Sequence, residues 1–347
     1  MSLLTLALLW PLRNLVFTGA NDFLSYYAGA RLVGTSDLYN PAKAQRVQLE
    51  SAGASSQTLP FTRLPYFAAF LWPLGKLPYL AAYACWQILN GIAFLLFLRL
   101  WPLQPVWTAR LLACACLGIG WSFANAQDHT FLLLWIAASL YLLRQEKPLA
   151  AGVVFALCAA KYHLFLLTPL ILLRRTNWRF ARGVLLGGGV LAAISFLAAG
   201  WDWPVVYARA LLSANIHGKM TDAPNIHGLA YSLAWGMPGK LFCAAITTAL
   251  VARIARRGTF ETALGACLLG GYLISPHLFF HDTAILMPAA LLSGVLSNSE
   301  LSRILALLLI LPIPLAEFIL PFPEGMLISV AILALLAAMQ REAAPES

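Results

Sequence analysis

Charged residues are scarce in this sequence. Asp, Glu, Lys and Arg together make up 11% of the 347 residues, whereas apolar residues make up 61%. Ordinary soluble domains contain about 25% charged residues. Apolar runs of about 17–25 residues recur along the chain, and each is long enough to cross a hydrocarbon core of about 30 Å. The composition therefore excludes an ordinary soluble protein and predicts an all-α polytopic membrane protein.

The sequence also lacks the cysteine spacings that bind metals or form redox pairs. Its six cysteines all fall inside apolar runs, and no Cys-x-x-Cys pair occurs. Cysteines in such positions behave as small buried hydrophobic residues. No glycine-rich loop that would cradle the phosphates of a nucleotide is present. We therefore expect no metal and no cofactor.

Acidic residues are fewer than basic ones, and the net charge is +9. In a soluble protein this charge would suggest nucleic acid as a partner. Here the basic residues lie in short loops between apolar runs, where the positive-inside rule explains them, and no nucleic-acid partner is expected. The basic residues that we expect in the cytoplasm are Arg99, Arg110, Arg144, Lys147, Arg174, Arg175, Arg179, Arg182, Arg253, Arg256, Arg257, Arg303 and Arg341.

With these loops inside, the pattern predicts about ten spans, both termini in the cytoplasm, and one integral membrane domain over residues 1–347. The two long polar stretches, 19–65 and 201–236, become extracytoplasmic loops, as do the turns at 124–129 and 276–282. No repeat and no separate soluble domain is apparent. The expected spans are 3–18, 80–98, 111–123, 131–143, 183–200, 238–255, 263–275, 283–296, 304–320 and 325–339.

The apolar segment 149–173 is unusual because Lys161 lies near its middle and basic loops flank both ends. A single span would place one of these loops outside. Two short helices folded back at Lys161 would keep both loops inside. Backbone that is not helical is tolerated at membrane depth where it lines a cavity. We therefore expect a broken or re-entrant helix pair here.

Polar residues that are unusual in such a sequence gather on the predicted extracytoplasmic side. All six histidines lie on that side or at the break at Lys161. The sides were assigned from Lys and Arg alone, so this convergence is independent and predicts an extracytoplasmic active site at membrane level. The residues are Asp22, Tyr26, Tyr27, Arg31, Asn125, Gln127, Asp128, His129, Lys161, His163, His217, Asn225, His227, His277, His281 and Asp282.

Each of these residues also has a structural interpretation. Asp22 can cap the helix that begins after it, and Lys161 can extend its amine to the interface. The pair Tyr26–Tyr27 suits an aromatic belt. The pair Asp128–His129 favours a turn, and His277 can be an ordinary interfacial histidine. Both interpretations stay open for the sequence alone.

Several motifs resemble one enzyme family. The stretch Asn-Asp22-Phe-Leu-Ser-Tyr-Tyr27-Ala-Gly-Ala-Arg-Leu, followed by Asp37-Leu-Tyr-Asn-Pro41, resembles the signature of glycosyltransferase family 87. That family includes the polyprenol-phosphate-mannose-dependent mannosyltransferases. The sequence departs from the family pattern at Arg63, Ala126 and Tyr162. Further matches follow in order: Trp72-Pro-Leu-Gly-Lys-Leu-Pro78, Trp86-Gln-Ile-Leu-Asn90, Ala126-Gln127, Ala151-Gly152 before Lys161, and Ser275-Pro-His277 with Asp282.

The resemblance implies a GT-C-like fold in the cell membrane and an acidic base in the first outer loop, which is Asp22 here. It implies a polyprenyl-phosphate sugar donor, an acceptor that is a lipid or glycan, and contact with membrane lipid. A single carboxylate base with direct displacement predicts inversion at the anomeric carbon. Cations would stabilise the leaving phosphate, and the candidates are Lys161, His277, Arg63 and Arg31. The expected substrate pocket consists of Tyr26, Tyr27, Gln127, His163, His281 and Asp282.

Two alternatives belong to other classes of protein. A transporter or flippase of a lipid-linked or anionic solute would build a midplane site from broken helices, and the break at Lys161 would suit it. An inactive scaffold subunit is the other alternative. The sequence lacks paired halves of similar hydropathy, and its polar residues gather at one face, which favours the enzyme.

Overall fold

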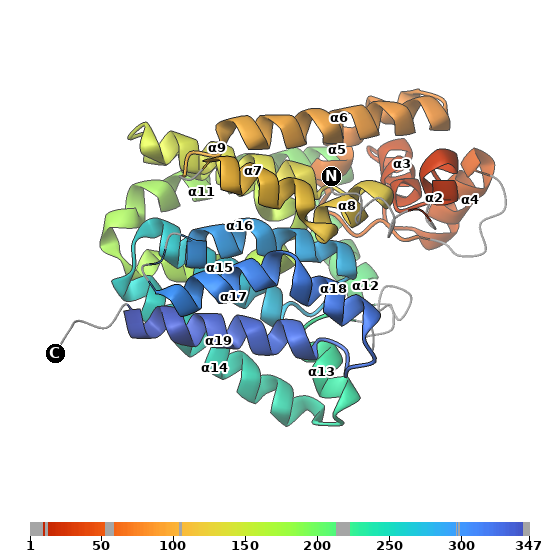
Figure 1. Ribbon diagram of the computed structural model, residues 1–347. Helices are drawn as coiled ribbons and strands as arrows, with labels where there is room; N and C mark the ends of the chain where they lie inside the picture. The colour runs from red at the N-terminus through yellow and green to blue at the C-terminus, as the bar shows by residue number, and fades with distance from the viewer. Residues whose placement is uncertain are drawn as a thin grey trace.

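The computed structural model describes residues 10, 13–52, 59–103, 106–212, 223–295, 297 and 299–342, and these residues form helices and turns without any strand among them (Figure 1). The α-helices are α2 (Arg13–Thr18), α3 (Phe23–Leu32), α4 (Pro41–Ala52), α5 (Pro65–Leu71), α6 (Tyr79–Leu100), α7 (Val106–Ala115), α8 (Leu117–Ala124), α9 (His129–Arg144), α10 (Pro148–Ala156), α11 (Trp178–Ala199), α12 (Trp203–Leu212), α13 (Ile226–Ser232), α14 (Gly236–Arg257), α15 (Phe260–Ile274), α16 (Leu286–Ala290), α17 (Glu300–Ile310), α18 (Pro312–Ile319) and α19 (Met326–Glu342). The 3₁₀ segments are η2 (Leu74–Lys76), η3 (Leu157–Phe165), η4 (Thr168–Leu173), η5 (Arg175–Asn177) and η7 (Phe280–Ile285), and one π-helical turn, η8, covers Leu291–Val295.

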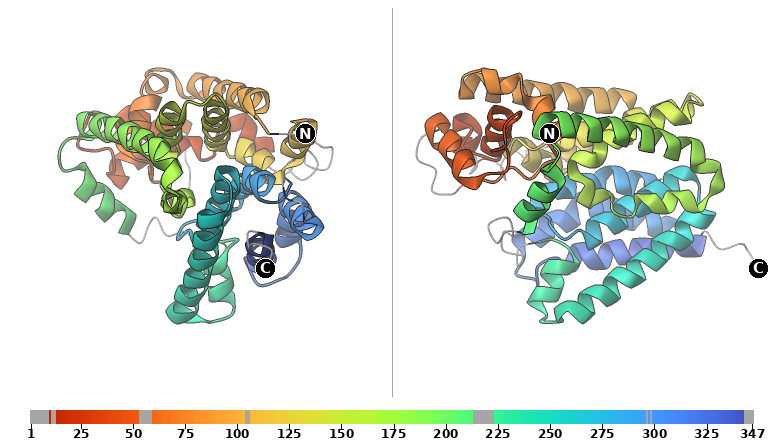
Figure 2. Two further views of the ribbon diagram at one scale, coloured as in Figure 1. Left: turned by 90° about the vertical axis from the view of Figure 1, so that its left-hand side faces the viewer. Right: turned by 180° about the vertical axis from the view of Figure 1, so that it is seen from behind.

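The longer helices run roughly in one direction, so the molecule has two ends (Figure 1). Helices α2, α3 and α4 form a group at one end, and the C-terminus lies at the other, as the view from behind in Figure 2 also shows. At the C-terminal end, Arg144 pairs with Glu261 at 3.2 Å, and Arg174 donates a hydrogen bond to the carbonyl of Gly258. Basic loops that are far apart in the sequence therefore share this end.

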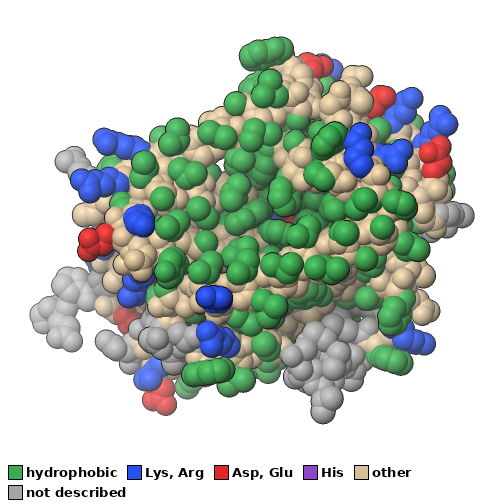
Figure 3. Space-filling model, turned by 90° about the horizontal axis from the view of Figure 1, so that it is seen from above, with side chains coloured by type: hydrophobic (Ala, Val, Ile, Leu, Met, Phe, Trp, Pro, Cys, Tyr) green, Lys and Arg blue, Asp and Glu red, His purple; other side chains and the backbone are tan. Residues whose placement is uncertain are grey.

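Among the described residues, four helices are long and apolar enough to cross a membrane, or up to six if each bent pair counts as one span. Their outward leucines are not covered by protein: Leu185 and Leu197 of α11 are 71% and 87% exposed. Hydrophobic side chains are spread across the face drawn in Figure 3. An apolar surface of this kind suits lipid and supports an all-α membrane protein. The total of about ten spans stays a prediction.

The apolar segment 149–173 is broken as the sequence indicates. Helix α10 ends at Ala156, and Lys161 has non-helical dihedral angles of φ −126° and ψ 55°. Pro148 before the break and Asn177 after it line the same cavity. The segment therefore returns to the end at which it began. Its first part, Pro148–Phe165, is long and apolar enough to count as a span by itself, but the backbone at Lys161 shows that it is not one continuous helix.

Two other expected spans are bent. Helices α7 and α8 meet at 52° around Cys116, and α17 and α18 meet at 47° where Pro312 begins the second helix. A proline within a helix removes one backbone hydrogen bond and clashes with the preceding turn, which explains the second bend. The expected first span, 3–18, lies mostly outside the described residues, and Trp10 and α2 are its described parts.

Glycines allow two helices to approach closely. A Cβ atom on Gly152 of α10 would lie 2.0 Å from the carbonyl oxygen of Phe180, and one on Gly183 of α11 would lie 2.0 Å from that of Leu149. Small residues at such crossings let helix backbones touch, which is a common way for membrane helices to associate. The contact fixes α10 against α11 just before the break at Lys161.

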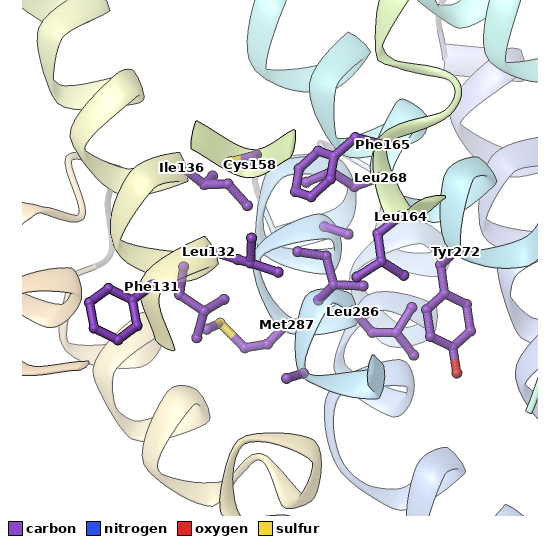
Figure 4. Packing of buried hydrophobic residues seen from close by; sticks show 14 of the residues in the cluster. Phe131, Leu132, Ile136, Cys158, Leu164, Phe165, Leu268, Tyr272, Leu286 and Met287 are labelled. Atoms are coloured by element: carbon purple, nitrogen blue, oxygen red, sulfur yellow. The ribbon is translucent and has the colours of Figure 1, made fainter. Parts of the chain in front are cut away.

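A buried hydrophobic cluster supports the site described below. The residues labelled in Figure 4 come from α9, η3, α15 and α16, and most of them lie between these elements, whereas the ring of Phe131 points away from the others. Three of them, Leu132, Leu164 and Leu286, are fully buried and follow His129, Lys161 and Asp282 by three or four residues. Packing of these leucines therefore holds the backbone that carries three polar residues.

Candidate active site

Asp22 lies at the start of α3, but its side chain does not cap that helix. Instead the side-chain oxygen of Asn21 accepts from the backbone N–H of Phe23 at 3.2 Å. The Asp22 carboxylate turns away and accepts a hydrogen bond through Oδ2 from Nε2 of Gln127. Burial raises the pKa of Asp22 above the usual 3.8, and the bond from Gln127 and the charges of Lys161 and Arg63 oppose this effect. The simple capping interpretation does not describe this residue.

Gln127 comes from the turn between α8 and α9. The preceding residue, Ala126, has a left-handed backbone with φ 52°, and its carbonyl accepts from Nε1 of Trp86 at 2.8 Å. A left-handed alanine is uncommon, and such residues concentrate at functional sites. Oε1 of Gln127 accepts from the hydroxyl of Tyr26 at 2.9 Å and from Nη2 of Arg63 at 3.2 Å. The turn thus joins α3 to the segment before α5.

Arg63 and Asp128 form a buried ion pair. Nε of Arg63 lies 3.0 Å from Oδ2 of Asp128, and Nη2 lies 3.1 Å from Oδ1. Nη2 also donates to the hydroxyl of Tyr26 at 2.8 Å. Burial alone would raise the pKa of Asp128, but the Arg63 guanidinium holds it well below its usual range. This two-point geometry fixes the orientation of both side chains.

Lys161, His129 and Asp282 meet in a second buried contact. Nζ of Lys161 lies 2.7 Å from Oδ1 of Asp282 and 2.9 Å from Nε2 of His129, which itself lies 2.8 Å from the same carboxylate oxygen. Nζ also lies 3.7 Å from Oδ1 of Asp128. We call Arg63, Asp128, His129, Lys161 and Asp282 the ionic cluster. Its two basic and two acidic charges balance, and the carboxylate of Asp22 stands beside it as a further negative charge.

A smaller polar group lies next to the ionic cluster. Oγ of Ser275 donates to the carbonyl of His277 at 3.0 Å, so Nδ1 of His163, 2.9 Å from the same Oγ, must hold the proton of that contact. The rings of His163 and His277 lie 6.1 Å apart, and both residues are half-buried. Nε2 of His281 lies 3.7 Å from Oδ2 of Asp282. The histidines therefore border the same region.

The structure gathers most of the residues that the sequence singled out. Of the residues assigned above to the base, the donor phosphate or the substrate pocket, two lie apart from this network. His217 lies outside the described residues. The hydroxyl of Tyr27 donates to the carbonyl of Leu77 at 2.7 Å, and its ring packs edge-on against Tyr79. Arg31 is exposed on α3, nine residues from Asp22, which is about 13 Å along a helix. The residues that lie together are Asp22, Tyr26, Arg63, Gln127, Lys161, His163, His277, His281 and Asp282.

Asp128 and His129 contribute more than the turn that the sequence favoured. Their backbone does form the turn, but both side chains belong to the ionic cluster. One feature of the sequence indicates that Asp128 forms an ion pair. A carboxylate in a mostly apolar sequence needs a cationic partner when it is buried, and Arg63 and Lys161 are such partners.

The structure shows two cavities away from Asp22. A cavity of about 320 Å³ lies between α4 and α12, lined in part by Tyr39, Phe61 and Arg209, and one of about 250 Å³ lies at the C-terminal end beside Arg144. Asp22 lines neither. Within the described ranges, no group of three or more His, Cys, Asp or Glu side chains could hold a metal ion.

Comparisons with known proteins agree with the motifs. Residues 61–276 match the family model of Glycosyltransferase family 87. No curated protein and no solved structure matches the chain. The matched segment contains Arg63, Gln127 and Lys161, whereas Asp22 precedes it and Asp282 follows it. Because the match covers more than half of the 347 residues, the chain belongs to glycosyltransferase family 87.

Proposed function

We propose that this membrane glycosyltransferase moves a sugar, mannose or a related hexose or pentose, from a polyprenyl-phosphate donor to a lipid or glycan acceptor. The observation that supports this proposal most is the position of Asp22. Its Oδ2 is held by Gln127, and among the described residues its Oδ1 has no hydrogen-bond donor. Oδ1 is therefore the oxygen that we assign as the general base.

In the proposed reaction, Oδ1 of Asp22 accepts the proton of an acceptor hydroxyl while that oxygen attacks the anomeric carbon. The bond from this carbon to the donor phosphate breaks, and polyprenyl phosphate leaves with the electron pair. The sugar becomes attached to the acceptor with inverted configuration. General-base assistance of this kind contributes about 10²–10⁴-fold to the rate.

The leaving phosphate needs positive charge or hydrogen-bond donors. Arg63 and Lys161 are already paired with Asp128 and Asp282, so they offer less net charge than the sequence suggested. We assign first contact with the phosphate to the half-buried His277 and place Lys161 and Arg63 behind it. Arg31 joins them only if the donor extends along α3. Tyr26, His163 and His281 would border the sugar.

The distribution of charge between the two ends of the molecule supports an assignment of each end to one side of the membrane. The basic loops at Arg144 and Arg174 share the C-terminal end, whereas Asp22 and the turn at Gln127 lie toward the other end, beside α3 (Figure 1). By the positive-inside rule, we propose a cell-membrane protein whose C-terminal end faces the cytoplasm and whose active site faces the extracytoplasmic side.

Asp22→Asn tests the catalytic assignment, with Asp37→Asn as its matched control. Asp37 lies in the same loop region and contacts Asn40 and Lys43. Membranes containing each variant would receive labelled polyprenyl-phosphate mannose, and labelled lipid and glycan products would be separated and quantified. We expect Asp22→Asn to lower transfer at least about 10²-fold and Asp37→Asn to retain it.

Retained transfer by Asp22→Asn would refute the base assignment. If the wild-type protein transfers no sugar from mannose, hexose or pentose donors, and instead moves a lipid-linked solute across vesicles at a rate that Asp22→Asn does not change, the protein is a transporter.

A further inference from the structure

The orientation of the Gln127 amide is determined by its neighbours. Its Oε1 accepts from two donors, the hydroxyl of Tyr26 at 2.9 Å and Nη2 of Arg63 at 3.2 Å. An amide nitrogen has no lone pair to accept either bond. The nitrogen must therefore be the atom that faces Asp22, where it donates to Oδ2.

The donors that hold Gln127 are themselves fixed. Arg63 is bound by both oxygens of Asp128, so its guanidinium cannot turn away. Tyr26 accepts from Nη2 of Arg63 at 2.8 Å, and its own proton is thus directed to Gln127. The left-handed turn at Ala126 completes the support of this side chain. A fixed chain of contacts runs from Asp128 to Asp22.

We infer that Gln127 is a positioning residue that orients Asp22, holding Oδ2 so that Oδ1 is presented to the acceptor, and that the buried pair of Arg63 and Asp128 sets this orientation. The base role of Asp22 rests on the proposed function. The hydrogen-bonding role of Gln127 does not depend on which substrate the enzyme uses.

A measurable consequence follows for the protonation of Asp22. An N–H that donates to a carboxylate favours the ionised form. The charged and titratable groups that act on Asp22 come from several elements: Tyr26 on α3, Arg63 before α5, Lys161 on η3 and Asp282 on η7. Asp128, beside Gln127, is paired with Arg63. Removing the Gln127 donor while these groups stay in place must shift the protonation of Asp22 to higher pH.

The experiment measures the protonation of Asp22 without any sugar substrate. Dicyclohexylcarbodiimide reacts with protonated carboxyl groups, and mass spectrometry of the peptide that contains Asp22 would give the extent of labelling at each pH. Gln127→Met removes the donor at similar size, and Gln127→Glu keeps the size but adds negative charge. Asn125→Ala is the control, because Asn125 lies in the same turn and bonds to the carbonyl of Trp121.

We expect the labelling midpoint to rise by about one pH unit in Gln127→Met, the size of effect that one charged hydrogen bond has. It should rise further in Gln127→Glu and stay unchanged in Asn125→Ala. A purely structural role predicts the opposite order, because glutamate keeps the contacts to Tyr26 and Arg63 that methionine loses. An unchanged midpoint in both Gln127 variants would overturn the inference.

Two measurements keep the test decisive. If Gln127→Met does not give a monodisperse protein, Gln127→Asn, whose amide is one methylene shorter, should show the same upward shift, and an unchanged midpoint there also overturns the inference. The acid limb of sugar transfer should move in parallel with labelling. Should transfer be absent in every protein while the labelling shift is present, the proposed function fails and the positioning of Asp22 stands.

Discussion

Asp22 carries its negative charge where burial opposes that charge. Burial raises its pKa above 3.8, and the hydrogen bond from Gln127 and the charge of Lys161 only partly offset this effect. A general base works in its ionised form, so a raised pKa moves the pH at which the base is lost upward.

The pH dependence of transfer should reflect this shift. We expect the rate to fall as the pH falls through the raised pKa of Asp22, with the midpoint of the acid limb above 3.8. The rate of labelled sugar transfer, measured in membranes at saturating donor from pH 4 to pH 8, gives the midpoint. A limb centred at or below 3.8 would contradict the assigned environment of Asp22.

The same shift affects stability. Between the unfolded and the higher folded pKa of Asp22, the folded protein binds more protons than the unfolded chain, so stability falls as the pH rises through this window. The variant Asp22→Asn has no carboxyl group at this position and therefore does not lose stability in this way. We expect the variant to melt at a higher temperature than the wild-type protein above the window, with a difference that shrinks as the pH is lowered. A lower melting temperature at neutral pH would show that the carboxylate stabilises the fold.

Individual residues of the candidate site stood out in the sequence, but their partners could not be predicted. Asp22, Gln127 and Lys161 stood out because polar side chains are unusual in apolar sequence. The pairing of Arg63 with Asp128, 65 residues apart, and of Lys161 with Asp282, 121 residues apart, depends on how helices pack. One sequence carries no local signal for such contacts. Tyr26 and Tyr27 show the same limit of sequence-based prediction. Tyr26 joins the candidate site, whereas its neighbour Tyr27 does not.

Between elements, the pair of Arg63 and Asp128 ties the segment before α5 to the start of α9. Both side chains are buried, and removing one partner would leave the other charge unpaired. We expect Asp128→Asn to destabilise the protein by about 3–5 kcal/mol. The double variant Arg63→Met with Asp128→Leu should lose less than either single variant, because neither charge of this pair remains. Equal or additive losses in the melting of purified proteins would argue against a buried pair.

The crossing of α10 and α11 gives a second test between elements. Gly152→Ala and Gly183→Ala each place a methyl group against a backbone carbonyl, and we expect a loss of about 1–3 kcal/mol from overpacking. Gly188→Ala on the same helix meets nothing within 4 Å, and it should be neutral or stabilising because alanine favours helix. Melting temperatures in detergent would compare the three. Equal effects at Gly183 and Gly188 would mean that the crossing is looser than described.

The extents of elements could largely be predicted, because a membrane span must be apolar over most of its length. The expected spans 80–98 and 238–255 lie within α6 and α14. The bend at Cys116 could not be predicted, since neither proline nor a polar residue marks it. The bend at Pro312 had a visible cause that a count of apolar residues overlooks.

For the whole molecule, the arrangement of basic loops predicts which end faces which compartment. In a protein whose native cysteines are replaced, Lys43→Cys on α4 should react with a membrane-impermeant maleimide added outside intact cells. Gln145→Cys, at the opposite end, should react only after the membrane is permeabilised. Mass shifts of the purified proteins would record labelling. Both sites reacting from the same side, or the reverse pattern, would refute the proposed orientation.

Lys and Arg alone predicted that the loops at Arg144 and Arg174 share one end of the molecule, as they do. The compartment that each end faces stays a prediction from the charge of short loops. The order in which helices pack around the ionic cluster could not, because all of the apolar faces are chemically alike. A single sequence shows which segments are apolar, but it does not show which of them pack against one another.

The non-helical backbone at Lys161 has a consequence for the parity of the membrane crossings. An unbroken helix there would add one crossing and would invert every segment that follows, from α11 to the C-terminus. Asp282 would then face a different compartment from Asp22. The two halves of the chain can contribute to one candidate site because this one segment turns back, so we expect the residue that joins the ionic cluster also to keep the cluster in a single compartment.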